Sequence, residues 1–159
     1  MALQGTRSDL LVDQFGTVCS QLRATIVGVP DEKWQTPTTG DGRQVNVVAH
    51  HAASAHRPIA DMVQAMVAGE KPSIGMDQIH AGNAEHARQF AACSKAETLE
   101  QHDQGVAYAM AVLGGLSDEQ LATQGEFLVG RPMTVAQAIQ GVLIHHPEEH
   151  TATIQASVT

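Results

Sequence analysis

The chain has 159 residues, of which 43% are hydrophobic and 16% are charged, and its formal net charge is −8 at pH 7 with the nine histidines neutral. This balance is typical of one globular domain over residues 1–159 and excludes an intrinsically disordered chain. The acidic excess is unfavourable for binding bare nucleic acid or an anionic membrane surface. No apolar run approaches the roughly 20 residues of a membrane-spanning helix.

The N-terminal residues and the cysteines predict a cytoplasmic protein. The first residues, MALQGTRSDLL, lack the basic, apolar and small-residue pattern of a signal peptide. Two cysteines, Cys19 and Cys93, are too few for a disulfide framework, so we expect both to be reduced thiols.

The first half of the chain predicts two long helices. One runs from about Ser8 to Ile26, because its apolar residues recur at helical spacing. The second runs from about Gln44 to Ala68 and is rich in alanine. Pro58 lies inside this second helix, where a proline is expected to produce a kink.

The second half predicts an irregular third segment and a final helix. The stretch DQIHAGNAEHARQF has a helical pattern, and a new helix then begins and runs towards Leu113. The stretch EFLVGRPM resembles a strand, but its Arg-Pro pair favours an extended loop. Three capping boxes mark helix starts. They are Ser94 with Glu97, Ser117 with Gln120, and Thr134 with Gln137. Four long helices without a convincing strand pattern predict an all-α four-helix bundle.

The two histidines of HHPEEH lie on one face of the final helix. At about 100° per residue, His150 lies about 40° from His146. Both continue an apolar stripe, formed by Val135, Ile139, Val142 and Leu143, which is expected to face the core. His145 lies about 100° away, at the edge of the stripe.

On the second helix, the same geometry selects His51. Five apolar residues lie within about 60° of it, and they are Val47, Val48, Ala55, Pro58 and Met62. His50 lies at the flank of this stripe, and His56 is nearly opposite. The pattern therefore predicts three inward histidines, His51, His146 and His150.

Three inward histidines permit two interpretations. Each imidazole brings polar nitrogens whose burial costs free energy unless a partner satisfies them. One divalent transition metal would satisfy His51, His146 and His150 together and leave a coordination position open for water or a substrate. The alternative is a set of core histidines that form hydrogen bonds with neighbouring groups.

The same residues carry a resemblance to the DinB-like superfamily. RQVNVVAHHAASAHR resembles its second-helix signature, in which spaced valines precede the first metal histidine, here His51. HHPEEHTATI resembles its fourth-helix H-x-x-x-H signature, here His146 and His150. The chain departs from the pattern at Arg43, where tryptophan is usual, and at Pro147 between the two histidines.

The resemblance implies a metal-binding four-helix bundle that is often a homodimer. Members with a known activity include metal-dependent transferases of low-molecular-weight thiols, such as bacillithiol and mycothiol, onto electrophiles. A thiol at the open metal position would become a thiolate at neutral pH. Three imidazoles suit zinc, nickel, iron or copper, and we expect zinc or nickel first and iron next.

Two other functions remain open. A metal-dependent hydrolase is one, in which metal-bound hydroxide would be the nucleophile. Within this class, His146, Glu149 and His150 spell the inverted zinc-protease motif, in which Glu149 would be the general base. That motif needs a further carboxylate ligand downstream, so Glu148 and Glu149 are expected either to be solvated or to form hydrogen bonds with the metal ligands. The other is a non-enzymatic metal-binding or stress-associated protein, which steady turnover of a thiol and an electrophile would exclude.

Some weaker candidates could border the site. His102, Asp103 and Tyr108 share the third long helix, although a solvated or packing role is expected more often for such residues. A second group lies in MDQIHAGNAEH and is a candidate for the border of the entrance. It consists of Asp77, His80, Asn83 and His86. His80 and His86 are six residues apart, so they do not share a helix face.

Overall fold

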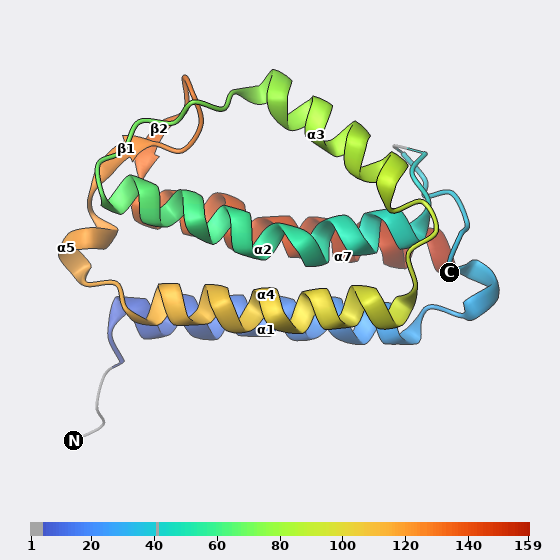
Figure 1. Cartoon of the computed structure of the whole chain (residues 1–159). Coiled ribbons are helices and arrows are strands. Elements are labelled where there is room, and N and C mark those ends of the chain that lie inside the picture. The colour runs from blue at the N-terminus through green and yellow to red at the C-terminus, as the bar shows by residue number, and fades with distance from the viewer. Residues whose placement is uncertain (1–4, 41) are drawn as a thin grey trace.

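The computed structural model, which describes residues 5–40 and 42–159, is a helical bundle. Its long helices are α1 (Arg7–Gly28), α2 (Val45–Val67) and α4 (Lys95–Gly114). The fourth combines α6 (Val135–Ala138), the π-helical turn η2 (Ile139–Ile144) and α7 (His145–Val158). The helices lie side by side in two layers, with α2 and α7 above α1 and α4 (Figure 1). The four-helix bundle predicted from the sequence is confirmed.

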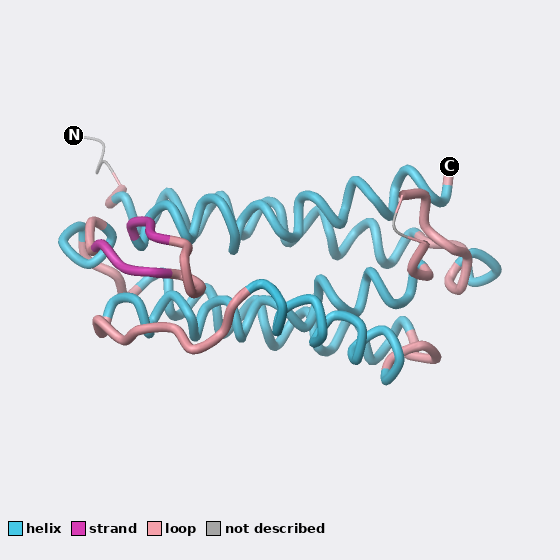
Figure 2. The backbone as a smooth tube through the Cα atoms, turned by 90° about the horizontal axis from the view of Figure 1, so that it is seen from above, coloured by secondary structure: helices cyan, strands magenta, loops and turns pink. Residues whose placement is uncertain are grey.

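Shorter elements close the two ends of the bundle and cover one side of it. They are η1 (Asp31–Lys33), α3 (Met76–Gln89), α5 (Asp118–Leu121), β1 (Gln124–Glu126) and β2 (Pro132–Thr134). Helix α3 lies outside the bundle, over α2, and the β1–β2 hairpin lies at the end opposite the loop that holds η1 (Figures 1 and 2). The irregular third segment is confirmed as two separate helices, α3 and α4. No described helix is both long and apolar enough to cross a membrane.

The stretch predicted as an extended loop forms an antiparallel hairpin, so this prediction was wrong in part. Gln124 pairs with Thr134 and Glu126 with Pro132. Gly130 has φ of +78°, a conformation that glycine adopts without steric cost, and it permits the turn before Arg131. Because the pairing covers only three residues on each strand, a pattern of alternating hydrophobicity is too short to reveal it.

The predicted capping boxes are all present. The backbone N–H of Glu97 donates to Ser94 Oγ at 3.1 Å, and the N–H of Ser94 donates to the Glu97 carboxylate at 2.8 Å. The same reciprocal pairs join Ser117 to Gln120 and Thr134 to Gln137. Each satisfies two helix N–H groups that have no partner inside the helix, which is worth about 1 kcal/mol. These local signals define where α4, α5 and α6 begin.

The core face of α2 differs from the predicted one. His51, Ala55 and Met62 are only partly buried, whereas the fully buried residues include Ala53 and His56 on the other side of the helix. Gly105 of α4 permits α2 and α4 to approach each other closely at His56, because a Cβ added at Gly105 would lie 3.2 Å from His56 Cβ. The prediction that His56 faces away from the core was therefore wrong. Small side chains permit close packing but contribute little to an apolar pattern.

The π-helical turn changes which face of the final helix is buried. After η2, the buried residues are Pro147, Thr151 and Ile154, and His146 and His150 lie beside this row, partly buried. A π-turn adds residues to one turn and rotates the helix that follows it. The sequence pattern, taken as an uninterrupted α-helix, placed His146 and His150 within the core stripe. That placement is wrong, because η2 rotates the helix that follows it.

The packing of α2 also bears on the predicted homodimer. The alanine-rich face of α2 packs inside the chain and offers no surface to a partner, since Ala49, Ala52, Ala53 and Ala60 are fully buried. The homodimer therefore stays a prediction that rests on the resemblance. Sedimentation velocity at micromolar concentration should give the mass of two chains, and the mass of one chain would contradict it.

Candidate metal centre

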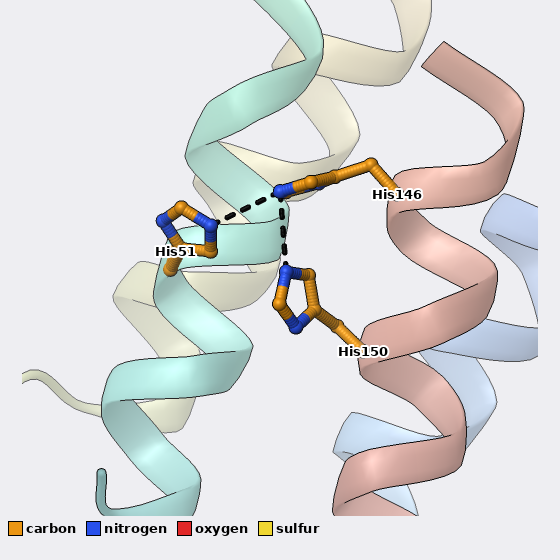
Figure 3. Close-up of side chains that lie close together, drawn as sticks. All are labelled: His51, His146 and His150. Carbon is orange, nitrogen blue, oxygen red and sulfur yellow. Dashed lines mark hydrogen bonds between the residues drawn. The ribbon is translucent and has the colours of Figure 1, made fainter. Parts of the chain in front are cut away.

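Three histidines from two helices direct their Nε2 atoms toward one another (Figure 3). His51 comes from α2, and His146 and His150 come from successive turns of α7. His146 Nε2 lies 3.0 Å from His51 Nε2 and 3.1 Å from His150 Nε2. The structure thus brings together the three residues that the sequence selected. They are the single group of three or more histidine, cysteine or acidic residues in the described chain arranged to hold a metal ion.

The spacing of these nitrogens fits a metal ion. Two imidazole nitrogens about 2.1 Å from one ion lie about 3.0 Å apart at a right angle and about 3.4 Å apart at the tetrahedral angle. The observed separations of 3.0 and 3.1 Å lie in this range, and all three donor atoms lie within 4.8 Å of one another. Three neutral imidazoles could therefore hold one divalent ion here.

Hydrogen bonds among the rings alone satisfy this arrangement poorly. Each ring nitrogen offers one position in the ring plane, either an N–H or a lone pair. His146 Nε2 faces both other nitrogens and cannot serve two contacts well with one position. Its Nδ1 is buried and has no hydrogen-bond partner among the described residues. A cation that accepts one lone pair from each Nε2 is a better partner for the set than the rings themselves.

The environment keeps His146 neutral, as a metal ligand must be. The pKa of His146 is lowered to about 3, mainly by burial and to a smaller extent by the charges of His150, Arg43 and His145. Since histidine in water has a pKa near 6.5, the His146 ring has no positive charge at pH 7. Protonation therefore does not compete with metal binding at this residue near neutral pH.

A second histidine pair adjoins the three, and the sequence did not reveal it. His50 Nδ1 lies 2.8 Å from His86 Nε2, and the His86 ring meets the His51 ring edge-on at 5.6 Å between centroids. Burial lowers the pKa of His86 to about 4, with smaller effects from His50 and Arg43. His50 was predicted at the flank of its helix but is buried. Its partner lies on α3, 36 residues later, which no helical pattern can connect to it.

The three histidines lie at one end of a groove of about 700 Å³ between α2, α3, η2, α7 and the hairpin. His80, Asn83 and His86 of α3 line it, as expected, and Asp77 does not. His80 and His86 lie about 120° apart on their helix, yet both reach the groove. A helix that lies over an opening can contribute more than one face to it.

The candidates on α4 lie away from this groove. His102 is buried, and its Nδ1 lies 3.1 Å from His56 Nε2. Asp103 is exposed and accepts hydrogen bonds from Arg23 at 2.9 and 3.1 Å. The Tyr108 hydroxyl donates to Asp61. None of the three lines the groove, so the packing and solvated roles describe them.

The acidic residues of HHPEEH are exposed. Glu148 and Glu149 both face solvent, as predicted, and Glu149 also lines the groove. A carboxylate oxygen of Glu149 lies 3.8 Å from His145 Nε2 at the surface. Neither carboxylate belongs to the group of residues that could hold the ion.

Pro147 follows the π-helical turn and lies between the two α7 histidines. Its ring crowds the preceding turn and it has no N–H to donate, and the widened turn η2 accommodates both effects. Thr151 Oγ1 donates to the Pro147 carbonyl at 2.7 Å.

Replacing this proline should change metal affinity more than stability. Pro147→Ala permits a regular α-helical turn, which would rotate His146 relative to His51. We expect zinc affinity to fall about tenfold, as for other residues that orient ligands. The control Thr151→Val removes the hydrogen bond but keeps the proline. Competition with a chelating dye measures the affinity, and an unchanged zinc affinity in Pro147→Ala would contradict this role.

Comparisons with known proteins agree with this architecture. Residues 15–150 match the family described as the mycothiol maleylpyruvate isomerase N-terminal domain. The solved structures of the mycothiol-dependent maleylpyruvate isomerase and of a histidine-to-alanine mutant of it share the fold, with TM-scores of 0.73 and 0.72 at 12% identity. The alignments cover 96% of this chain and 62% of theirs. The comparison with curated proteins gives no match. The chain thus belongs to the mycothiol maleylpyruvate isomerase N-terminal domain family, within the DinB-like superfamily.

Proposed function

We propose that the protein is a metal-dependent transferase of a low-molecular-weight thiol, such as mycothiol or bacillithiol, onto an electrophile. In this proposal, His51, His146 and His150 hold the divalent ion. We expect zinc or nickel in first place and iron in second. The observation that carries the proposal is the convergence of three Nε2 atoms at the end of a groove large enough for small molecules. Membership of a family named for a mycothiol enzyme supports the choice of thiol.

The reaction needs a thiolate beside an electrophilic carbon. A divalent ion held by the three histidines would lower the pKa of a thiol bound to it and so supply a thiolate at neutral pH. The thiol proton passes to solvent and the sulfur bonds to the carbon. In an addition the neighbouring carbon then takes a proton from water, and in a substitution the carbon loses its leaving group to solvent, as monochlorobimane loses chloride. Arg43 lines the groove near His146 and His86, and its positive charge favours the anion that forms.

The thiol must come from outside the chain. Cys19 and Cys93 are both buried and form no disulfide. Burial raises the pKa of Cys19 to about 12 and also raises the pKa of Cys93. Neither lines the groove, so neither side chain supplies a thiolate to it at neutral pH.

Turnover tests the proposal. Protein loaded with zinc or nickel should conjugate mycothiol to monochlorobimane well above the uncatalysed rate, with bacillithiol and free cysteine as comparisons. Removal of the ion with a chelator should abolish the excess rate, and added metal should restore it. The variant Glu148→Gln, on the exposed face of α7 outside the groove, is the control and should keep the full rate. Stable metal binding with no conjugation of any thiol would favour the non-enzymatic metal-binding protein.

A further inference from the structure

The groove has two ends of different chemistry. Its wall on α2 runs from His51 past Pro58 to Met62, about 16 Å at 1.5 Å per residue. Arg43, His86 and the candidate metal ligands lie at the first end. Glu149, the one carboxylate among the described residues that line the groove, lies there too, beside His145.

The second end is apolar and is built from four elements. Met62 of α2, Met76 of α3, Met133 of β2, and Phe127 and Leu128 of the hairpin loop line it. Phe127 and Leu128 are buried, whereas the three methionines are only partly buried. Arg131, the one charged residue of the described chain that lines this end, is exposed at the turn of the hairpin. A charged group inside this end would lose its hydration without a partner, so the end favours an uncharged occupant.

The apolar walls can adapt to an occupant. Methionine side chains are flexible and polarisable and fit irregular shapes. Helix α3, which contributes Met76 and Ile79, has no buried residue among its 14 residues, so its packing on α2 is not tight. The groove volume of about 700 Å³ lies within the range of small-molecule sites.

We infer that the groove binds an electrophile with an uncharged hydrocarbon body, which lies along Met62, Phe127 and Met133 while its reactive carbon lies at the histidines. The position of the reactive carbon rests on the proposed function, and the apolar subsite does not. The thiol then occupies the polar end, beside Arg43 and His145. Met62 and Met133 determine specificity, because both side chains line the apolar end.

Binding of an apolar dye tests the subsite without any reaction. The fluorescence of N-phenylnaphthylamine should rise on binding to the full chain, and octanol should displace the dye while octanedioate at the same concentration should not. Met62→Glu and Met133→Glu should each weaken dye binding about tenfold, since they place a charge against the hydrocarbon. Val129→Glu is the matched control, because Val129 is 54% exposed in the same hairpin loop and does not line the groove.

The outcomes separate the subsite from the proposed function. Wild-type protein stripped of metal with a chelator should bind the dye as the metal-loaded protein does. Equal dye affinity in wild type, Met62→Glu, Met133→Glu and Val129→Glu, or displacement by octanedioate as effective as by octanol, would overturn the inference. If the glutamate variants fail to fold by circular dichroism, Met62→Gln and Met133→Gln replace them with the same expected direction. Dye results as expected without thiol conjugation would leave the subsite in place and reject the transferase.

Discussion

His150→Ala should abolish metal binding and thiol conjugation together. The variant removes one of three imidazoles that approach within 3.1 Å of a neighbour's Nε2, and two histidines of a three-ligand site hold a divalent ion far more weakly. Elemental analysis should find about one ion for each wild-type chain and almost none for the variant. Since an ion that binds only the folded state stabilises it by about 2.7 kcal/mol at a hundred times its dissociation constant, metal should raise the melting temperature of the wild type alone.

His145→Ala is the matched control for this prediction. His145 is the neighbour of His146 in the sequence, but its side chain is 60% exposed and outside the group that could hold the ion. His145→Ala should keep its bound metal, and added metal should still raise its melting temperature. Equal metal content in the wild type and in the His51, His146 and His150 alanine variants would contradict the site and leave a set of ordinary histidines.

His56→Ala should destabilise the metal-free protein by about 2–4 kcal/mol, the range for truncating a large buried side chain. His56 is 1% exposed, packs edge-on against Phe15 at 5.5 Å between ring centroids, and has its Nε2 3.1 Å from His102 Nδ1. The variant leaves a cavity and a buried ring nitrogen without its partner, and both cost free energy. By contrast, the helical pattern of the sequence placed His56 outside the core and so predicts that His56→Ala loses no stability.

Urea unfolding measures this effect, and the metal content supplies the contrast. His56→Ala should keep the ion, because His56 is not one of the three converging histidines. His80→Ala, at an exposed position of α3, should change the free energy of unfolding by no more than about 0.5 kcal/mol. It should also keep the ion. A His56→Ala variant as stable as the wild type would show that the pair with His102 contributes nothing to the fold.

The same buried histidine should make the protein unstable in acid. The pKa of His56 is lowered to about 3 in the folded protein, mainly by burial and to a smaller extent by the charges of His102 and His146, whereas the unfolded chain has the ordinary value near 6.5. Between these values the unfolded state binds a proton that the folded state does not. Stability is therefore complete above pH 6.5 and falls by up to about 1.4 kcal/mol per pH unit for this group as the pH falls towards 3. His56→Ala should show a shallower decline than the wild type, and equal slopes would contradict this origin.

The sequence alone determined the features that depend on neighbouring residues. The helix starts at Lys95, Asp118 and Val135 follow from capping boxes, whose hydrogen bonds join residues three apart and need no tertiary contact. The pairing of His146 with His150 follows from one turn of helix in the same way. His51 was selected by the spacing of the valines before it and by an apolar wheel, and the structure places its ring beside the other two.

Only the tertiary structure decided which faces are buried and which distant groups meet. The wheel for α2 selected His51 but assigned the core to the wrong side, because the close packing of Ala53 and His56 on Gly105 depends on another helix. The π-helical turn before α7 rotated His146 and His150 out of the core row, and no local signal measures that rotation. The bond from His50 to His86 and the groove's apolar end join segments that only the folding of α3 and the hairpin over α2 brings together. Sequence periodicity describes one helix at a time, whereas burial is a property of the contacts between helices.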